Sequence, residues 1–303
     1  MWEMEKVLCF GSLNIDYTYK VDHFVQKGET ISSQGLQVFS GGKGLNQSTA
    51  LAKAGVEIYH AGAVGRDGEF LLGQLRDVGV HTENVAVLTE VRSGNAIIQN
   101  DAEGDNCIIL YGGANQAVTR EQADAVIGKF SAGDYIILQN EISELAYIME
   151  TAHKNGMRIV LNPSPMNDKI LALPLEKVDL LMLNEVEAGQ ILGTDETDGD
   201  VLMEKLLKRF PEMKFVLTLG SQGSIYGDKR QKIKQSAYRV KAVDTTAAGD
   251  TFTGFFIGSL VKGLSVEQAM DIASRASAIA VTRSGAAPSI PTWDEVEAVK
   301  NWG

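Results

Sequence analysis

The chain has 303 residues, a length that permits one large α/β enzyme domain or two smaller domains. Its net charge of −11 argues against a nucleic-acid groove or an anionic membrane surface as a partner, because no basic stripe could release counterions. No apolar run approaches the roughly 20 residues that a membrane span needs. The charged first residues are not typical of a secretory signal, so we expect a cytoplasmic protein.

Apolar runs alternate with helical stretches along most of the chain. The candidate strands are residues 6–10, 58–61, 135–139, 158–161, 179–183 and 215–219. These runs lack polar alternation, which is typical of parallel strands covered on both faces. The pattern predicts a Rossmann-like open, mostly parallel sheet with helices on both faces, which binds ligands beyond the carboxyl ends of its strands.

The helices between these strands have recognisable ends. Thr119 followed by Gln122 predicts a capping box, and Ser143 can cap a helix that ends near residues 155–156. The apolar stretch 252–261 is about half the length of a membrane span, so we interpret it as a buried helix.

Two segments show the alternation of exposed strands instead. Residues 16–21 and 36–39 alternate between polar and apolar side chains, and so do residues 95–99 and 106–110. The second two segments are predicted to form a β-hairpin, with Gly104 in the turn supplying a positive φ. Four such strands would form a small protruding sheet, with insertions at about 14–40 and 93–112. The sheet could be a lid, a dimer surface or both; the alternative is that these segments are irregular surface loops. Neither a repeat nor a linker divides the chain, so we expect a single domain over residues 1–303.

Two cysteines, Cys9 and Cys107, lie in apolar runs without Cys-x-x-Cys spacing. We interpret both as buried free thiols in a reducing compartment. The four histidines are scattered, so a histidine-based metal site is not expected.

The strongest chemical signal is the segment 244–252, Asp-Thr-Thr-Ala-Ala-Gly-Asp-Thr-Phe. The small residues Ala247, Ala248 and Gly249 allow close backbone approach, and the helix that follows leaves N–H groups and a positive dipole end there. Such an anion hole could stabilise a phosphoryl group during transfer. Asp250 at its mouth could accept a proton from an attacking hydroxyl. It could equally be the cap of a buried helix, and the spacing alone does not decide between the two.

The second signal is the turn at residues 41–47, Gly-Gly-Lys-Gly-Leu-Asn-Gln. Its glycines allow tight backbone approach before a helix that begins near residue 44. The segment is not a P-loop, and it is not a dinucleotide fingerprint because Gln47 stands where a third glycine is required. On its own it could be an ordinary turn.

Together the two motifs resemble the paired signature of the ribokinase-like carbohydrate kinase family. The resemblance runs from about residue 6 to residue 291 and includes the segments 11–16, 28–30, 162–165, 184–187, 218–223 and 278–286. It implies an ATP-dependent kinase that phosphorylates a primary hydroxyl of a sugar, O5 of D-ribose in the first instance, with Asp250 as the base. The alternatives within the family are fructose, 2-keto-3-deoxygluconate and a nucleoside.

The resemblance also implies a set of residues that bind the sugar. These are Asn14, Asp16, Gly41, Gly42, Lys43, Asn46, Glu141 and Asp250. Asp16 and Glu141 can accept hydrogen bonds from vicinal hydroxyls. The side chains of Asn14, Asn46 and Lys43 can donate them, and such paired contacts reject analogues that lack a hydroxyl.

The ATP side and the cations are implied in the same way. The nucleotide positions are Asn184, Glu187, Thr218, Gly220, Ser221, Gly223, Gly249 and Ser274, of which the first two resemble the motif that orders Mg²⁺ and phosphate through waters. On spacing alone, Glu187 would be an exposed helix residue. A monovalent cation, K⁺, would bind at Asp244, Thr246, Ala280, Arg283, Gly285 and Ser289, mostly through carbonyl oxygens. A cation there could order residues 247–249 before chemistry.

Two departures from the family pattern stand out. Ala247 replaces the first glycine of the usual Gly-Ala-Gly-Asp, and Leu45 replaces a smaller residue near the sugar pocket. Outside the family, a nicotinamide oxidoreductase is disfavoured by the missing fingerprint, and a non-catalytic sugar sensor by the intact Asp250. An apolar outer face on the small sheet favours a homodimer.

Overall fold

The main sheet of the protein has nine strands. In the computed structural model, which describes residues 5–103 and 105–299, these are β1 (Val7–Phe10), β4 (Ile58–Gly65), β5 (His81–Leu88), β8 (Tyr135–Gln139), β9 (Arg158–Asn162), β10 (Leu180–Asn184), β11 (Lys214–Thr218), β12 (Ser224–Gly227) and β13 (Lys232–Gln235). Their order is β13-β12-β11-β10-β9-β8-β1-β4-β5, and all neighbours from β11 to β5 are parallel. The antiparallel pairings among its described strands are β11–β12 and β12–β13, so that β12 runs opposite to the others. The predicted open, mostly parallel sheet is confirmed.

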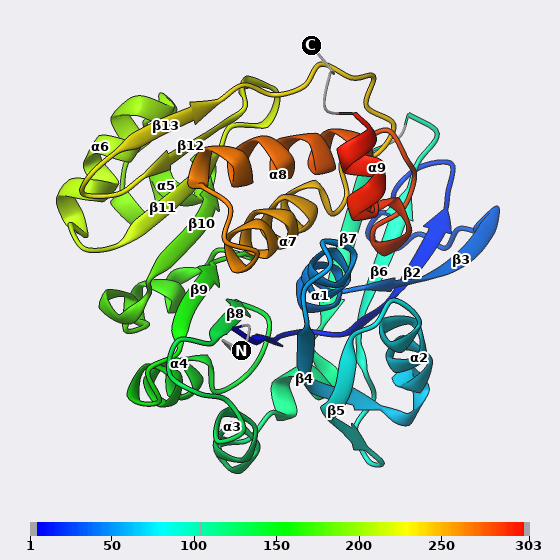
Figure 1. Cartoon of the computed structure of the whole chain (residues 1–303). Coiled ribbons are helices and arrows are strands. Elements are labelled where there is room, and N and C mark those ends of the chain that lie inside the picture. Colours follow the sequence, from blue (N-terminus) through cyan, green and yellow to red (C-terminus); the bar gives the residue numbers. More distant parts are fainter. Residues whose placement is uncertain (1–4, 104, 300–303) are drawn as a thin grey trace.

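Helices cover both faces of this sheet (Figure 1). They are α1 (Lys43–Lys53), α2 (Glu69–Asp77), α3 (Arg120–Ile127), α4 (Leu145–Lys154), α5 (Glu185–Leu192), α6 (Gly199–Arg209), α7 (Ala248–Val261), α8 (Val266–Ala280) and α9 (Trp293–Ala298). Within the described ranges, no helix is both long and apolar enough to cross a bilayer.

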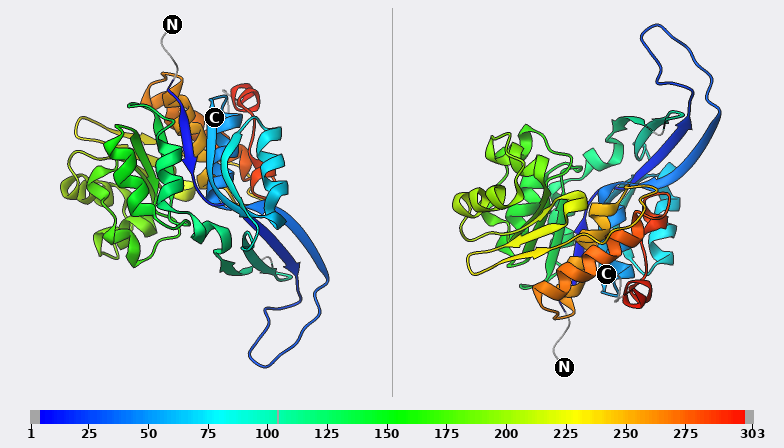
Figure 2. Two further views of the ribbon diagram at one scale, coloured as in Figure 1. Left: turned by 90° about the horizontal axis from the view of Figure 1, so that it is seen from below. Right: turned by 90° about the horizontal axis from the view of Figure 1, so that it is seen from above.

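The two faces of the sheet have separate hydrophobic cores. Along β1, Val7 and Cys9 pack into the core beneath α1, α2, α7 and α8, whereas Leu8 and Phe10 pack into the core beneath α3 to α6. Figure 2 shows these two helical layers on either side of the strands. Because successive side chains of a strand point to opposite faces, burial on both faces requires the unbroken apolar runs from which the strands were predicted.

Local signals predicted the helix ends with two errors. The capping box predicted at the start of α3 is incomplete, because the Gln122 side chain does not bond back to Thr119 and its Nε2 donates to the Gly62 carbonyl oxygen at 2.7 Å. Thr119 caps α3 by accepting a hydrogen bond from the Gln122 N–H, and α7 spans the apolar stretch that we predicted to be a buried helix. Ser143, however, is not a cap. α4 begins after Glu144, and the Ser143 hydroxyl donates instead to the Val118 carbonyl oxygen at 2.9 Å.

A second, smaller sheet leaves the carboxyl end of β1. Its strands are β2 (Asn14–Lys20), β3 (Gly35–Gly41), β6 (Gly94–Asn100) and β7 (Asn106–Tyr111), in the order β3-β2-β6-β7. The predicted small sheet is thus confirmed over the alternative of irregular loops; Gly104 lies outside the described residues. In Figure 2 this sheet and the loop between β2 and β3 project from the body of the molecule.

The small sheet exposes an unusual number of apolar side chains. The large exposed ones on its strands are Leu36, Val38, Ile97, Ile108, Ile109, Leu110 and Tyr111. Cys107 is also exposed on β7, so the prediction of a buried thiol is wrong there, whereas it is confirmed for Cys9.

Candidate active site

The N-terminus of α7 has no side-chain cap. Its N-cap residue, Ala247, has left-handed backbone angles of φ 60° and ψ 10° and forms no side-chain capping bond. The Ala248 N–H donates to the Thr245 carbonyl at 3.2 Å, whereas the N–H groups of Gly249 and Asp250 have no hydrogen-bond partner among the described residues. The first turn of α7 therefore presents free main-chain donors and the positive end of a helix dipole, as an anion site requires.

The Asp250 carboxylate is buried and points across to α1. Its Oδ2 accepts from the Asn46 Nδ2 at 3.0 Å, and its Oδ1 accepts from the Gln47 Nε2 at 2.9 Å. Asp250 is therefore not the cap of α7, and of the two interpretations of this residue the role of proton acceptor stays as the prediction. The glycine-rich turn and the segment 244–252 meet directly at this carboxylate.

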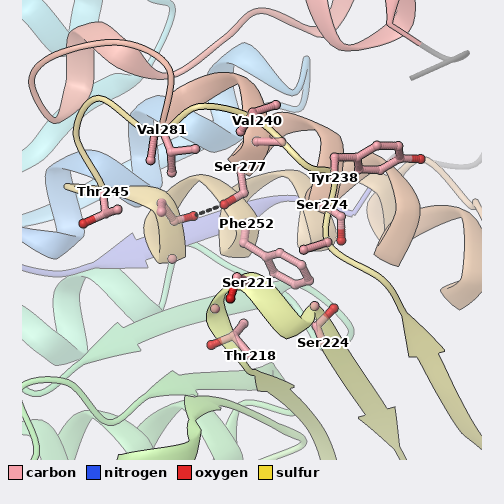
Figure 3. Close-up of a pocket in the computed structure, with 17 residues that line it drawn as sticks. Thr218, Ser221, Ser224, Tyr238, Val240, Thr245, Phe252, Ser274, Ser277 and Val281 are labelled. Atoms are coloured by element: carbon pink, nitrogen blue, oxygen red, sulfur yellow. Dashed lines mark hydrogen bonds between the residues drawn. The ribbon is translucent and has the colours of Figure 1, made fainter. Parts of the chain in front are cut away.

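Two adjoining cavities follow the N-terminus of α7. The smaller one, about 220 Å³, is lined by Lys43, Glu187 and Asp250 among others. The larger one, about 350 Å³, has the predicted ATP residues Thr218 and Ser221 on one side (Figure 3). Opposite them lie Ser277 and Val281 of the α8 region, which were not predicted. Residues Thr218, Thr245, Ala248 and Gly249 line both cavities. The cavities lie at the carboxyl ends of β9, β10 and β11, where an open α/β sheet binds its ligands.

The sugar side of the site begins at the base of the small sheet. Asn14, the first residue of β2, accepts a hydrogen bond through Oδ1 from the Asn115 Nδ2 at 2.7 Å. The Asn115 Oδ1 in turn accepts from the Leu13 N–H at 3.0 Å. The Asn14 amide nitrogen is thereby oriented as a donor. Asn115 was missed because it lies in a 3-10 helix, Gly113–Ala117, without any local motif.

Two carboxylates, Asp16 and Glu141, face each other across this side. Burial, with the Glu141 charge as a second cause, raises the pKa of Asp16 to about 6, and burial also raises the pKa of Glu141. Glu141 Oε2 accepts hydrogen bonds from the Lys43 N–H at 2.9 Å and from the Ser12 hydroxyl. A Cβ atom at Gly41 would lie 1.9 Å from Asp16 Oδ2, so only glycine leaves room for this carboxylate.

α1 presents the remaining side chains of the glycine-rich turn. Gly42, its N-cap, has φ 92°, which favours glycine. Burial alone would lower the pKa of Lys43, but nearby carboxylates, above all Asp250 and Glu141, raise it above its ordinary value. Leu45 is buried in the core and lines neither of the two cavities.

Asn46 presents an acceptor that the sequence analysis did not predict. Its Nδ2 is already bonded to Asp250, and its buried Oδ1 has no partner within the described chain. An unpaired buried acceptor is costly, by roughly 1–3 kcal/mol, until a ligand hydroxyl satisfies it. Asn46 therefore offers an acceptor in addition to the second N–H of its amide.

The motif at residues 184–187 is a complete capping box at the start of α5. Asn184 Oδ1 accepts from the Glu187 N–H at 2.8 Å, and Glu187 Oε2 accepts from the Asn184 N–H at 3.0 Å. Glu187 also accepts a hydrogen bond from the Ser164 hydroxyl, and it is only 8% exposed. It is thus a cavity residue, not the exposed helix residue that spacing alone indicated.

This donor set suits a hydrated Mg²⁺ that arrives with nucleotide phosphates. In the part of the chain that the structure describes, no three His, Cys, Asp or Glu side chains gather into a metal cluster. Mg²⁺ commonly keeps several waters and binds through one or two carboxylates together with substrate phosphates. Glu187, whose oxygens already accept protein hydrogen bonds, fits a contact through water.

Two segments, 244–246 and 280–289, bring together the residues predicted for a monovalent cation. Asp244 accepts from the Thr246 N–H at 2.8 Å and from the Gly285 N–H at 2.9 Å, and these bonds outweigh burial and lower its pKa. A carboxylate accepts about four hydrogen bonds or ligands, so Asp244 keeps capacity for a cation. The Arg283 guanidinium is bonded to Glu295 at 2.6 Å, which leaves only its carbonyl for such a role.

The site combines free main-chain donors at a helix start with a buried carboxylate. Two adjoining cavities lie beside them at the carboxyl edge of the sheet. This arrangement is that of a nucleotide-dependent phosphotransferase. Residues 4–293 match the model of the pfkB family carbohydrate kinases, and the chain belongs to this family. This membership excludes the nicotinamide oxidoreductase that we considered from the sequence.

Named relatives agree over almost the whole length. The chain is 35% identical to the ribokinase of Staphylococcus aureus (strain COL), with 97% of this chain and 99% of the relative covered. A crystal structure of ribokinase from Thermotoga maritima has a TM-score of 0.87 at 32% identity, covering 98% of this chain and 100% of that one. A structure of Arabidopsis thaliana ribokinase complexed with ribose and ATP has the same TM-score, 0.87, at 28% identity, covering 99% of both chains.

Proposed function

We propose that the protein transfers the γ-phosphoryl group of ATP to O5 of D-ribose and so produces ribose 5-phosphate and ADP. The observation that carries this proposal is the buried carboxylate of Asp250, held by two α1 amides beside the uncapped N-terminus of α7. Ribose as the acceptor is supported by the ribokinases that match over nearly the full chain and by the solved relative in complex with ribose and ATP.

Asp250 acts as the general base of this reaction. Its carboxylate takes the proton of the O5 hydroxyl as that oxygen attacks the γ-phosphorus, and the bond to the β-phosphate oxygen breaks to release ADP. The main-chain donors of residues 247–249 stabilise the charge on the transferred group, and each such donor is typically worth ~10²–10³ in rate. Among the described residues only the Ala248 N–H of this group has a hydrogen-bond partner, which leaves the N–H groups of Ala247 and Gly249 free for the phosphate.

The sugar is held by side chains of both polarities. Asp16 and Glu141 accept hydrogen bonds from its hydroxyls, and Asn46 Oδ1 accepts another. The Asn14 amide and the Lys43 ammonium donate to hydroxyl oxygens. A sugar without one of these hydroxyls leaves a buried group unpaired, which is the basis of discrimination.

ATP would occupy the larger cavity, with its phosphates pointing to the smaller one. The loop 218–223 and Ser274 line the base end, and Gly249 lies where the two cavities join. Asn184 and Glu187 would hold a hydrated Mg²⁺, which neutralises phosphate charge during transfer.

The loop 283–289 would bind K⁺ together with Asp244 and Thr246. The Gly285 N–H is bonded to Asp244, three residues before Ala247. A cation bound between these two segments would fix residues 247–249, the turn that forms the anion hole. We therefore propose that K⁺ activates the enzyme.

The small sheet would serve as the lid and as the dimer surface. As a lid it would close over the sugar and exclude water, because an open site would hydrolyse ATP. Its exposed apolar side chains on β3 and β7 are the proposed contact in a homodimer. The chain would work as one kinase domain with this sheet inserted, in the cytoplasm, where ATP is supplied.

A coupled ADP-release assay tests the proposal directly. We expect ADP release with D-ribose, a phosphorylated product at O5, and a rate that rises when K⁺ replaces a large organic cation. Fructose, 2-keto-3-deoxygluconate and nucleosides form the comparison panel. Faster turnover on one of these would reassign the substrate, and ribose binding without ADP release would make the protein a sugar sensor.

A further inference from the structure

Two buried glutamines form a hydrogen-bonded chain behind Asp250. Gln139, the last residue of β8, donates from Nε2 to the Gln47 Oε1 at 2.7 Å. Gln47 on α1 donates from Nε2 to the Asp250 Oδ1 at 2.9 Å. Both glutamines are 0% exposed, and neither of them lines either cavity described above. Gln47 thus contacts the proposed base, Gln139 contacts it through Gln47, and neither side chain is exposed to a substrate.

The far end of the chain is also fixed. The Gln139 Nε2 approaches the Cys9 Sγ at 3.6 Å, and the Cys9 thiol donates to the Gly44 carbonyl oxygen at 3.4 Å. Cys9 lies in the middle of the main sheet and Gly44 in the first turn of α1. This row of hydrogen bonds is therefore anchored in the main sheet and in α1.

The polarity of every bond in this chain follows from its end point. An ionised carboxylate only accepts hydrogen bonds, so Gln47 must turn its NH₂ group toward Asp250. Its carbonyl oxygen then points to Gln139, which must supply a donor. If Gln47 turned around, its oxygen would face the carboxylate and repel it. The Gln139 amide prevents this reversal.

We propose that Gln139 is a positioning residue that acts through Gln47 to hold Asp250 oriented toward the attacking hydroxyl. This inference rests on the proposed phosphoryl transfer with Asp250 as base. It assigns a role in the reaction to two residues that would otherwise count as core, and it explains why the glycine-rich turn ends in glutamine.

The environment of Gln139 favours this role over simple core packing. Its Oε1 is buried without any hydrogen-bond partner in the described part of the chain, which typically costs roughly 1–3 kcal/mol. The oxygen fits only because residue 11 is glycine, since a Cβ there would lie 2.2 Å from it. An apolar side chain would avoid this cost. The two N–H groups of the amide are what an apolar residue cannot replace.

The test uses two substitutions of similar shape. Gln139→Met removes the donor, and Gln139→Glu presents an acceptor to the Gln47 oxygen. We expect kcat to fall on the order of 10- to 100-fold in both, since misplacing a catalytic group by about 1 Å can cost 10²-fold. KM for ribose and for ATP should change by no more than about twofold, because neither side chain touches substrate. The acidic limb of the pH–kcat profile should move to higher pH, because a carboxylate that loses a donor binds a proton more readily.

Asn155→Asp is the matched control. The Asn155 amide donates to the carbonyls of Ile127 at 3.2 Å and Phe130 at 2.9 Å, at the far end of α4. Its loss should lower the melting temperature while kcat and the pH profile stay at wild-type values. If Gln139 were merely structural, its variants would behave like this control, and the proposal would be overturned.

The Asp250→Asn variant separates this inference from the proposed function. If Asp250→Asn is nearly inactive and both Gln139 variants keep full kcat, the positioning role is wrong and the base assignment stands. If Asp250→Asn keeps full activity, the proposed base itself is wrong. In the Asp250→Asn background, Gln139→Met should change the residual rate by less than about twofold, since residues that act as a unit are non-additive.

Discussion

The predicted phosphate end and the predicted sugar end of the active site present different kinds of groups to their ligands. The phosphate end is the single turn 247–250, whose free donors belong to the main chain. The sugar end is assembled from the side chains of β2, α1 and the residues after β8, and it includes two carboxyls with raised pKa values, Asp16 and Glu141. The first end depends on backbone conformation, and the second depends on residue identity. Substitutions should therefore affect the two ends in different ways.

The largest effect should come from the residue that joins the two ends. Asp250→Asn keeps the size of the side chain but removes the base, and we expect kcat to fall by roughly 10²–10⁴-fold. The affinity for ribose, measured by calorimetry, should change much less because the sugar contacts remain. Turnover of Asp250→Asn at the wild-type rate would contradict the assignment of Asp250 as the base.

Gly41→Ala should damage the sugar end selectively. The added Cβ would lie 1.9 Å from Asp16 Oδ2 and must displace this carboxylate. Losing a charge-assisted hydrogen bond costs about 1.5–3 kcal/mol, so KM for ribose should rise on the order of 10- to 100-fold while KM for ATP stays constant.

Gly35→Ala, at the opposite end of β3, is the control for this change, because its added Cβ would meet nothing within 4 Å. Steady-state kinetics of the pair give the answer. An equal rise of KM in both variants would mean that the strand, and not the Asp16 contact, is at fault.

The buried charge of Asp16 should make stability depend on pH. Its pKa in the folded protein is raised to about 6, so the folded state binds this proton more tightly than the unfolded chain does. The ionised group therefore opposes folding above that pH, and the opposition disappears toward about pH 4.

Asp16→Asn should accordingly melt at a higher temperature than the wild type near pH 8, with the difference lost near pH 4, while it binds ribose more weakly. Thermal unfolding at the two pH values measures this effect. Asp77→Asn, an exposed change at the end of α2, should show no such pH-dependent difference. A constant difference for Asp16→Asn at both pH values would argue against a buried charge.

The smallest effect should appear at the backbone of the phosphate end. Ala247 holds φ 60°, a region in which a non-glycine residue costs about 1–2 kcal/mol. We expect Ala247→Gly to raise the free energy of unfolding by roughly 1 kcal/mol, since glycine takes this conformation without strain.

Ala248→Gly is the comparison, because residue 248 is the first helical position of α7. There glycine should lower stability by roughly 0.5–1 kcal/mol. Urea unfolding of both variants measures the two signs. Destabilisation of equal size at both positions would show that the left-handed turn stores no strain.

The sequence was most informative where chemistry is local. Six of the seven parallel strands were predictable because burial on two faces demands apolar runs such as Val7–Phe10. The edge strand β5 was missed because it alternates between buried and exposed residues. The hairpin strands β12 and β13 were missed as well; both are only four residues long, and β13 alternates lysine with other residues. The motifs at 41–47 and 244–252 predicted which residues would meet, and the structure confirms that Asp250 contacts the turn.

Contacts between distant segments could not be read from the sequence. Asn115 orients Asn14 across a separation of 101 residues, and Gln139 reaches Gln47 across 92, and no local pattern singles out Asn115 or Gln139. The unpaired Oδ1 of Asn46 was also beyond prediction, because spacing does not say which end of an amide its neighbours will occupy. The ligand roles of the nucleotide and cation residues remain predictions.

The strand β2 follows β1 after a short connection and places Asn14 and Asp16 within the small sheet. If the small sheet is the lid and these residues bind the sugar, as we propose, any movement of the sheet would also move part of the sugar site. Stiffening the sheet would tighten affinity and slow product departure at the same time. If two such sheets pair in a dimer, the hold of one subunit on its sugar would be mechanically tied to that of its neighbour.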